Sequence, residues 1–385
     1  MSDPTSVAVL GATGSVGTQT LDVIASHADR FTVSGLAAGT NDELLVRQAR
    51  RLRVPRVALA DEAAAARARR ALGAGVEVLG GADGVLELAG AGADVVLNGM
   101  VGSRGLPATL AALGAGSRLA LANKESLIVG GQLVLDAARA GQLVPVDSEH
   151  MALAQCLRGG TAAEVARLVV TASGGPFRGR TRSELADVSI DDALAHPTWD
   201  MGAVITVNSA TMANKGLEVI EAHLLFGIDF DRIDVVVHPQ SIVHAMVEFC
   251  DGAVLAQLSP PDMRLPIQLA LGWPDRLPHA PARMDWTAAA TLEFEPLDRQ
   301  TFPMVHLAVE AGRRGATYPG VLNAANEEAV AAFLGGRIPF LGIAAVVEAV
   351  LEEHTGGGPL DLGAVLEAEE RARTRARHRI ERRGR

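Results

Sequence analysis

The sequence predicts an α/β protein that begins with a Rossmann-type, doubly wound parallel sheet. Short apolar strands alternate with alanine-rich helical runs up to His150, which is typical of a parallel sheet covered by helices. The first strand leads through a glycine-rich turn into a helix, where such folds bind dinucleotides. After Gly160 the pattern changes to mixed strands and then to helices only. We therefore expect an α+β domain and a C-terminal helical domain after the sheet.

Composition limits the function. The chain has 385 residues, too many for one core, and it is 48% apolar and 21% charged, as is usual for soluble globular proteins. Its net charge of −10 argues against a nucleic-acid partner. The two cysteines, Cys156 and Cys250, indicate neither a disulfide framework nor a metal site. No secretory signal or membrane-spanning run is visible, so we expect a cytoplasmic protein without a membrane partner.

The first strands predict a dinucleotide site. The expected parallel strands are Val7–Leu10, Phe31–Ala38, Arg56–Ala60, Glu77–Leu79, Asp94–Asn98, Arg118–Ala122 and Leu143–Val146. Glycines 11, 14 and 17 follow the first strand, and their spacing lets a pyrophosphate approach the amides of the next helix. This motif alone is weak, but its position between strand and helix is the required one. The second strand has no carboxylate before Asp42 to hold a ribose 2′-hydroxyl, which favours NADP, although no basic residue follows either.

Lysine usage points to a second site. Of the 35 lysines and arginines only Lys124 and Lys215 are lysine, and a compact ammonium suits a phosphate or hydroxyl group. Around Lys215, residues 206–222 predict a short strand-like run and then a helix capped by Ser209 and ended by Gly227. One face of that helix carries Thr211, Asn214, Lys215, Glu218 and Glu221. An ordinary capped surface helix with a Lys/Glu pair remains an equal alternative for this stretch.

Carboxylates follow the seventh strand. Asp147 and Glu149 project to the same side if the backbone is extended there. Two such carboxylates repel unless a cation lies between them, and all-oxygen ligands suit Mg²⁺ or Mn²⁺. The alternative is that Asp147 or Ser148 caps a helix that starts at Met151, and taken alone this explanation is the stronger one.

The remaining chain predicts a lid, a hairpin and a helical end. A polar segment after the strand Val165–Thr171 is hinged by glycines and carries a histidine and a tryptophan, as active-site lids do. Asp251-Gly252 between two strands predicts a type I′ hairpin. The proline-rich stretch 273–301 predicts an extended linker, and helices follow from Phe302. For the basic C-terminus we expect a solvated helix end that frays, with nucleic-acid binding as the lesser alternative.

Several motifs together resemble the 1-deoxy-D-xylulose 5-phosphate reductoisomerase family of the non-mevalonate isoprenoid pathway. The motifs, in family order over nearly the whole chain, are GATGSVG, LANKESL, PVDSEHMALAQCL, TASGGPF, HPTWDMG, NSATMANKGLEVIEAHLLF, HPQSIVHAMVEF and LNAANEEAVAAFL. The resemblance implies an NADP-dependent oxidoreductase/isomerase and usually a homodimer. The implied reaction rearranges and reduces the small phosphorylated sugar 1-deoxy-D-xylulose 5-phosphate to 2-C-methyl-D-erythritol 4-phosphate. The implied parts are an NADPH-binding Rossmann domain (1–150), a catalytic α+β domain (151–272) with a lid at about 173–203, a linker (273–301) and a helical domain (302–385).

The resemblance also assigns roles to residues. The implied ligands of Mg²⁺ or Mn²⁺ are Asp147, Glu149 and Glu218. The implied phosphate grip is Ser173, Ser209, Asn214 and Lys215, with His196 closing from the lid and Trp199 shutting it over the substrate. Lys124, Ser148 and Glu149 face the reacting groups, so Lys124, Glu149 and His196 are the implied catalytic residues. The implied NADPH contacts are Thr13, Gly14, Ser15, Val16, Gly39, Thr40, Asn41, Asn123, Glu125 and Gly202.

Three parts of the chain depart from the family pattern, and three other classes of protein are weighed as alternatives to the family. Thr40 stands where the family often has a basic residue, Asn208 where it often has Asp, and residues 98–105 match only loosely. A short-chain dehydrogenase needs Tyr-x-x-x-Lys, but the only tyrosine is Tyr318 and position 322 is leucine. Neither cysteine suits the nucleophile of a semialdehyde dehydrogenase. A non-catalytic dinucleotide sensor would leave the carboxylates and the phosphate grip unexplained.

Overall fold

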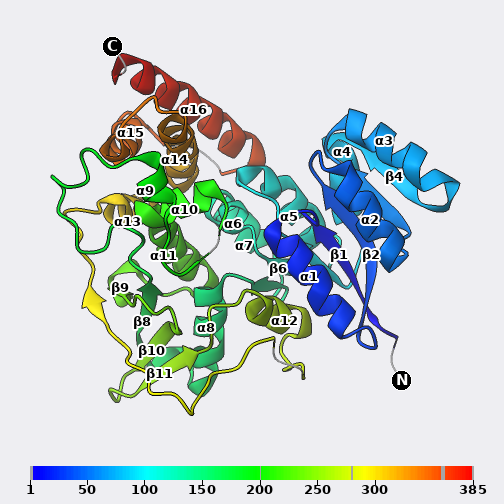
Figure 1. Cartoon of the computed structure of the whole chain (residues 1–385), viewed down its shortest axis with the longest axis horizontal. Helices are drawn as coiled ribbons and strands as arrows, with labels where there is room; N and C mark the ends of the chain where they lie inside the picture. Colours follow the sequence, from blue (N-terminus) through cyan, green and yellow to red (C-terminus); the bar gives the residue numbers. More distant parts are fainter. Residues whose placement is uncertain (1–2, 200, 279–280, 357–359, 384–385) are drawn as a thin grey trace. The chain divides into compact units, whose positions relative to one another are not determined.

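The computed structural model describes residues 3–199, 201–278, 281–356 and 360–383. The chain divides into two compact units (Figure 1). Unit 1 comprises Met1–Ser126, Val134–Met151 and Asp262–Ala282, and unit 2 comprises Leu127–Leu133, Ala152–Pro261 and Arg283–Arg385. Residue 200 of the predicted lid, residues 279–280 of the predicted linker, and parts of the predicted first and last domains (1–2, 357–359 and 384–385) lie outside the described residues.

Unit 1 is built on a seven-stranded sheet with the strand order β4-β3-β2-β1-β5-β6-β7, in which every neighbouring pair is parallel. The strands are β1 (Thr5–Leu10), β2 (Phe31–Ala38), β3 (Arg56–Leu59), β4 (Glu77–Gly80), β5 (Val95–Asn98), β6 (Arg118–Leu121) and β7 (Leu143–Pro145). All seven strands predicted from the sequence are present. The order reverses between β2 and β5 around β1, and in open α/β sheets this switch point is where ligands bind.

Helices connect the strands of this sheet. They are α1 (Ser15–Ser26), α2 (Asp42–Leu52), α3 (Glu62–Leu72), α4 (Gly81–Ala89), α5 (Leu106–Gly114), α6 (Lys124–Gly130), α7 (Gln132–Ala137) and α8 (Ser148–Cys156), with α12 (Arg264–Gly272) added from later in the chain. The strand β1 is buried on both faces, with Val7, Val9 and Leu10 at 0% exposure, which explains its continuous apolar sequence. Arg118 joins α12 to the sheet by donating 2.6 Å hydrogen bonds to the carbonyls of Leu271 and Trp273.

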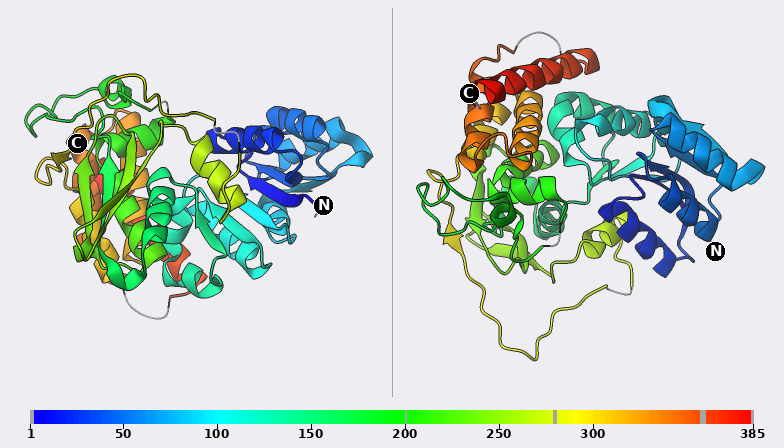
Figure 2. Two further views of the ribbon diagram at one scale, coloured as in Figure 1. Left: turned by 90° about the horizontal axis from the view of Figure 1, so that it is seen from below. Right: turned by 45° about the horizontal axis from the view of Figure 1, so that its top comes forward.

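Unit 2 contains a mixed five-stranded sheet with the order β11-β10-β8-β9-β12. Its strands are β8 (Val165–Ala172), β9 (Ile233–Val237), β10 (Val243–Phe249), β11 (Val254–Leu258) and β12 (Glu295–Pro296). The strands β8 and β9 are parallel, and the other pairs are antiparallel. The strand β12 belongs to the predicted linker, which is therefore anchored to the sheet at this point, while Figure 2 shows the rest of 283–296 as extended chain.

The helices of unit 2 share one hydrophobic core with its sheet. They are α9 (Ile190–Leu194), α10 (Ala203–Ala210), α11 (Ala213–Phe226), α13 (Met304–Arg314), α14 (Tyr318–Leu334), α15 (Phe340–Glu352) and α16 (Leu362–Arg383). Close packing of α11 on α13 depends on Gly216, because a Cβ atom there would lie 2.7 Å from the Cβ of Ala308. The helices α14, α15 and α16 lie side by side (Figure 1). None of the helices in the described part of the chain has the length and hydropathy needed to span a membrane.

Three local predictions were wrong. The run before Ala213 is the helix α10, not a strand, so Ser209 lies inside a helix and Met212, in the left-handed region at φ 63°, precedes α11. The Asp251-Gly252 hairpin forms, but only Gly252 has a positive φ, whereas a type I′ turn needs two such residues. Up to Arg383 the basic end is not a solvated tail, because Ala372, Ala376 and Ile380 are buried. It belongs to α16, where Arg373 and Arg377 form ion pairs with Glu327 and Glu328 of α14.

Candidate active site

The glycine turn of unit 1 gives the first backbone amides of α1 no side-chain cap, so they can bind an anion. Gly14 precedes α1 in an extended conformation and gives the helix no side-chain cap. Gly17 is required for close approach, because its Cβ atom would lie 2.2 Å from the carbonyl oxygen of Gly11. Ser15 and Gly14 are exposed, and Thr13 and Val16 are partly so. The turn can therefore receive a pyrophosphate at the positive end of the helix, as its spacing predicts.

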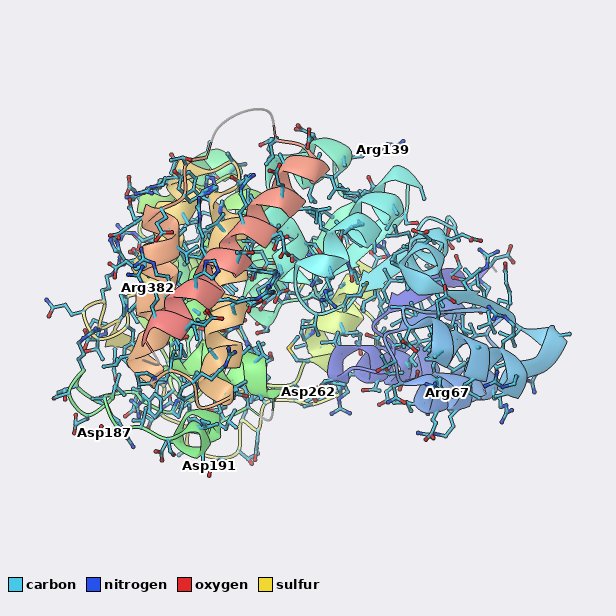
Figure 3. All side chains as sticks on the ribbon, turned by 90° about the horizontal axis from the view of Figure 1, so that it is seen from above. Arg67, Arg139, Asp187, Asp191, Asp262 and Arg382 are labelled. Carbon is cyan, nitrogen blue, oxygen red and sulfur yellow. The ribbon has the colours of Figure 1, made fainter. Side chains whose placement is uncertain are left out.

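The loop after β2 holds the first carboxylate in an ion pair. Gly39, Thr40 and Asn41 are exposed, and Asn41 caps α2 by accepting a 3.1 Å hydrogen bond from the amide of Leu44. Asp42 accepts from the guanidinium of Arg67, with a shortest distance of 2.6 Å. This hydrogen bond lowers the pKa of the Asp42 carboxyl group. Arg67 reaches across from α3 and lies at the outside of unit 1 (Figure 3). Asp42 is therefore occupied by Arg67.

Asn98 and Asn123 fix the loop that follows β5. Asn98 is fully buried at the end of β5 and donates to the carbonyl of Gly105 at 3.2 Å and to the Thr109 hydroxyl at 3.0 Å. The side chain of Asn123 donates to the carbonyls of Met100 and Gly102 at 2.7 and 2.9 Å. The predicted cofactor residue Asn123 is thus 1% exposed and holds this loop in place, and it donates to the Glu125 carboxylate at 3.2 Å.

Lys124 and Asp147 form an ion pair at the carboxyl ends of the neighbouring strands β6 and β7. Their side chains are only 9% and 12% exposed. His150 is buried, with its Nδ1 atom 4.0 Å from Asp147. Removing two charges from water costs free energy that offsets much of their mutual attraction, so a buried ion pair is weak evidence of a stabilising contact. Its position at the carboxyl ends of parallel strands is instead typical of a functional site.

The extended backbone predicted for Asp147 and Glu149 is wrong. The helix α8 starts at Ser148, three residues earlier than the capping alternative supposes, so Glu149 lies in its first helical turn and not on an extended strand. Ser148 donates a hydrogen bond to the Glu149 carboxylate. Carboxylates are favoured at a helix N-terminus, and the turn after β7 presents two of them at the sheet edge where ligands bind.

In unit 2, His196 of the predicted lid contacts Ser173 at the end of β8. The Nε2 atom of His196 lies 2.9 Å from the Ser173 hydroxyl oxygen. Its Nδ1 atom accepts hydrogen bonds from the amides of Thr198 and Trp199 at 3.1 and 2.9 Å. Desolvation by burial lowers the pKa of His196, so the ring is neutral near pH 7. Since Nδ1 accepts, the proton is on Nε2, which donates to Ser173.

The polar face of α11 is buried. Lys215 and Glu218 form an ion pair and are 4% and 1% exposed. Asn214 donates to the second carboxylate oxygen of Glu218 at 2.5 Å. The capped surface helix, left open by the sequence, is excluded by this burial. Three predicted site residues thus meet on one helix, because positions three and four apart share a face.

A glycine turn brings the end of α10 close to Ser173. Gly175 has φ +65°, and a Cβ atom there would lie 2.8 Å from the carbonyl oxygen of Ser209. Ser209 itself is partly buried near the end of α10. Gly202, at the start of the same helix, is exposed, and Trp199 packs edge-on against His244 with ring centroids 6.5 Å apart.

Sequence reasoning missed several residues that hold these groups. Asn98 was noted only as part of a loosely matching stretch. Asn326 donates at 2.8 Å to Asn208, and both side chains are buried between α14 and α10. No role was predicted for the loop at His238 either, although it lies in the quoted motif HPQSIVHAMVEF. Buried asparagine and histidine in quoted motifs were the available signal, since buried polar groups need specific partners.

The Rossmann sheet with its glycine turn and the buried lysine–carboxylate pairs define a dinucleotide-binding enzyme. Three family models match the chain: 1-deoxy-D-xylulose 5-phosphate reductoisomerase over residues 7–131, its C-terminal domain over 143–226, and the DXP reductoisomerase C-terminal domain over 258–375. The chain belongs to the 1-deoxy-D-xylulose 5-phosphate reductoisomerase family. The family and the enzyme class predicted from the sequence are thereby confirmed.

Relatives and solved structures match the chain along nearly its full length. The chain is 60% identical to the 1-deoxy-D-xylulose 5-phosphate reductoisomerase of Kitasatospora griseola, covering 96% of this chain and 98% of that one. It is 59% identical to that of Pseudarthrobacter chlorophenolicus, with 98% of each covered. The Zymomonas mobilis enzyme in complex with NADPH has a TM-score of 0.92 at 44% identity, covering 98% of this chain and all 100% of that one. A DOX-P reductoisomerase in complex with NADPH, fosmidomycin and magnesium has a TM-score of 0.92 at 36% identity, with 98% of each covered. The predicted fold class is confirmed.

Proposed function

We propose that the chain converts 1-deoxy-D-xylulose 5-phosphate to 2-C-methyl-D-erythritol 4-phosphate with NADPH and a divalent cation. The observation that carries this is family membership over the full chain, joined to buried lysine–carboxylate pairs at the motif positions. The predicted parts keep their roles in the proposal: cofactor binding by 1–150, catalysis by 151–272 with the lid at 173–203, and support by the linker 273–301 and the helices of 302–385.

The carboxylates suit a magnesium ion, or manganese in its place. We assign Asp147, Glu149 and Glu218 as the ligands, because three carboxylates are a hard-oxygen donor set. In support, Asp147 and Glu218 each accept a lysine ammonium, so both positions are arranged around positive charge. When bound, the cation supplies Lewis-acid stabilisation of negative charge on adjacent substrate oxygens. Lys124 and Ser148 donate hydrogen bonds to the reacting oxygens, and Glu149 accepts a proton from a hydroxyl group.

The remote phosphate binds to unit 2. We assign Lys215, Asn214, Ser173 and Ser209 as donors to the phosphate oxygens, with His196 donating from the lid through Nε2, the atom that donates to Ser173 in the structure. Neutral His196 can only donate there because its Nδ1 is occupied by backbone amides. Trp199 then covers the substrate and excludes water. Binding energy from the phosphate thus orders the lid over the reacting end.

The cofactor is NADPH rather than NADH. Thr13, Gly14, Ser15 and Val16 form the turn for the pyrophosphate, and Gly39, Thr40 and Asn41 lie where the adenosine ribose belongs. The first carboxylate after β2, Asp42, is engaged by Arg67 and is not free to hold a 2′-hydroxyl. Asn123, Glu125 and Gly202 complete the proposed contacts, Asn123 by fixing the loop after β5.

We further propose a homodimer in the cytoplasm. The edge strand β11 exposes Val254 and Leu255, which are 51% and 41% exposed and suit a protein interface. Both cysteines are free, which fits a reducing compartment. Analytical ultracentrifugation tests the dimer.

The function itself is tested by NADPH oxidation. Purified protein with Mg²⁺ should oxidise NADPH only when the ketose phosphate is added, and removing the cation with a chelator should stop the reaction. No substrate-dependent oxidation in the presence of Mg²⁺ would refute the proposal.

A further inference from the structure

Residues close to Ser173 and His196 in the sequence form hydrogen bonds with the loop 238–243 of unit 2. The amide of His238 donates at 2.6 Å to the carbonyl of Ala172, directly before Ser173. The hydroxyl of Thr198, two residues after His196, donates at 3.3 Å to the carbonyl of Pro239. The loop therefore joins the end of β8 to the part of the lid that carries His196.

The ring of His238 determines the shape of this loop. His238 is fully buried, and its Nε2 atom accepts from the amides of Ile242 and Val243 at 3.2 and 3.1 Å. The neighbouring Ser241 has φ 51°, a conformation that a non-glycine residue keeps only where its surroundings enforce it. Since Nε2 accepts, the proton is on Nδ1. It is donated at 2.8 Å to the carbonyl of Glu293.

The segment 293–295 secures the loop from the other side. The side-chain amide of Gln240 donates to the Glu293 carboxylate at 2.8 Å and accepts from the Glu293 amide at 3.2 Å. The ring of Phe294 stacks on His238, with centroids 4.8 Å apart and planes at 17°. Glu295 pairs with Arg178, near the start of the lid, at 2.5 Å. The linker segment thus contacts both the loop and the lid.

We propose that Thr198 and His238 are positioning residues that hold His196 as an Nε2–H donor aimed at the substrate phosphate. Thr198 contributes twice, because its amide occupies Nδ1 of His196 while its hydroxyl anchors the lid to Pro239. His238, secured by the segment 293–295, keeps the Pro239 carbonyl in place. The inference rests on the proposed phosphate grip and adds the residues that orient it.

Thr198→Val tests the proposal, since it removes the hydroxyl and keeps the shape and the amide. We expect KM for the ketose phosphate and Kd for a phosphonate inhibitor to rise about 3- to 10-fold, the factor for one neutral hydrogen bond, while kcat and KM for NADPH stay near wild type. Thr198→Ser should restore both constants. Gln240→Ala, at a half-buried position, should shift KM in the same direction without threatening the fold.

Thr181→Val is the matched control, because the Thr181 hydroxyl bonds only to Ser183 and Glu184 among the described residues. It should behave as wild type. An unchanged phosphonate Kd in Thr198→Val, or equal losses with Thr181→Val, would overturn the proposal.

A second readout separates this inference from the proposed function. In ¹⁵N-histidine NMR spectra of the protein without substrate, His196 should show the pure Nε2–H tautomer in wild type and in Thr181→Val. Thr198→Val keeps both amides on Nδ1 and should keep this tautomer, but the loss of the anchor to Pro239 should loosen the hydrogen bond from Nε2 to Ser173 and shift the Nε2 resonance. A mixed tautomer in wild type would refute the positioning role even if the enzyme is active, whereas a failed assay with a fixed tautomer would refute only the function.

Discussion

The two lysines of a chain that otherwise uses arginine are both buried in ion pairs with carboxylates. Lys124 pairs with Asp147 and Lys215 with Glu218. The sequence could indicate these residues because residue type, spacing and motif are local properties. It could not give their burial, since the same helical face fits a surface helix equally well. What excluded that alternative was the packing of α11 in the core of unit 2.

Arg67 is the residue on which the cofactor preference can be tested. Arg67→Gln would release Asp42, which could then accept a hydrogen bond from the 2′-hydroxyl of NADH and repel the 2′-phosphate of NADPH. The ratio of kcat/KM for NADPH over NADH should fall about 3- to 10-fold, the factor for roughly 1 kcal/mol. Steady-state kinetics with both cofactors measure it. Arg371→Gln, at an exposed ion pair in unit 2, is the control, and an identical ratio in both variants would contradict the role of Asp42.

His196 gives a prediction for pH. Its folded-state pKa is lowered from the ordinary 6.5 by burial, so between the two values the unfolded chain binds a proton that the folded chain does not. Stability therefore falls as pH decreases below about 6.5. Chemical denaturation of wild type and His196→Gln at pH 7.5 and 5.5 should show the smaller loss in the variant. A larger loss in the variant would show that the ring is charged in the folded protein.

At the scale of elements, the alternation of strands and helices in unit 1 was predicted correctly, but the helix α10 was predicted as a strand-like run. The seven strands of unit 1 follow from runs such as Val7–Leu10, because full burial on both faces selects continuous apolar sequence. Residues 203–210 are rich in β-branched side chains and favour a strand by propensity. They form a helix because Val207 and Ala210 pack into the core of unit 2, and such packing outweighs weak local preferences.

The contact between α11 and α13 can be tested at Gly216. Gly216→Ala would place a Cβ atom 2.7 Å from Ala308 and 3.0 Å from the carbonyl of Met304, so one helix must shift. We expect a loss of about 1–3 kcal/mol in the free energy of unfolding, typical of overpacking. Denaturant titration measures it. Gly114→Ala, at a helical glycine with open space around its Cβ position, should be neutral or stabilising, and equal effects would contradict this packing argument.

For the whole molecule, length and composition predicted several domains but not their limits. Short apolar runs show that a core exists but do not show which segments share it. The helices after Phe302 and the sheet of unit 2 contribute to the same core, and α12 returns to unit 1 from late in the chain. Such long-range associations leave no local signal. The division into three domains and a linker stays a prediction.

The central proposal is that Asp147, Glu149 and Glu218 hold a cation and that Lys215 binds the substrate phosphate. The most direct test is calorimetric titration with fosmidomycin, which a solved relative binds together with magnesium. Wild type should bind it tightly with Mg²⁺ and NADPH, and a chelator should abolish that affinity. Lys215→Ala, checked for folding by its circular dichroism, should lose it even with Mg²⁺ present. Tight binding by wild type that is indifferent to the cation would contradict the three-carboxylate site.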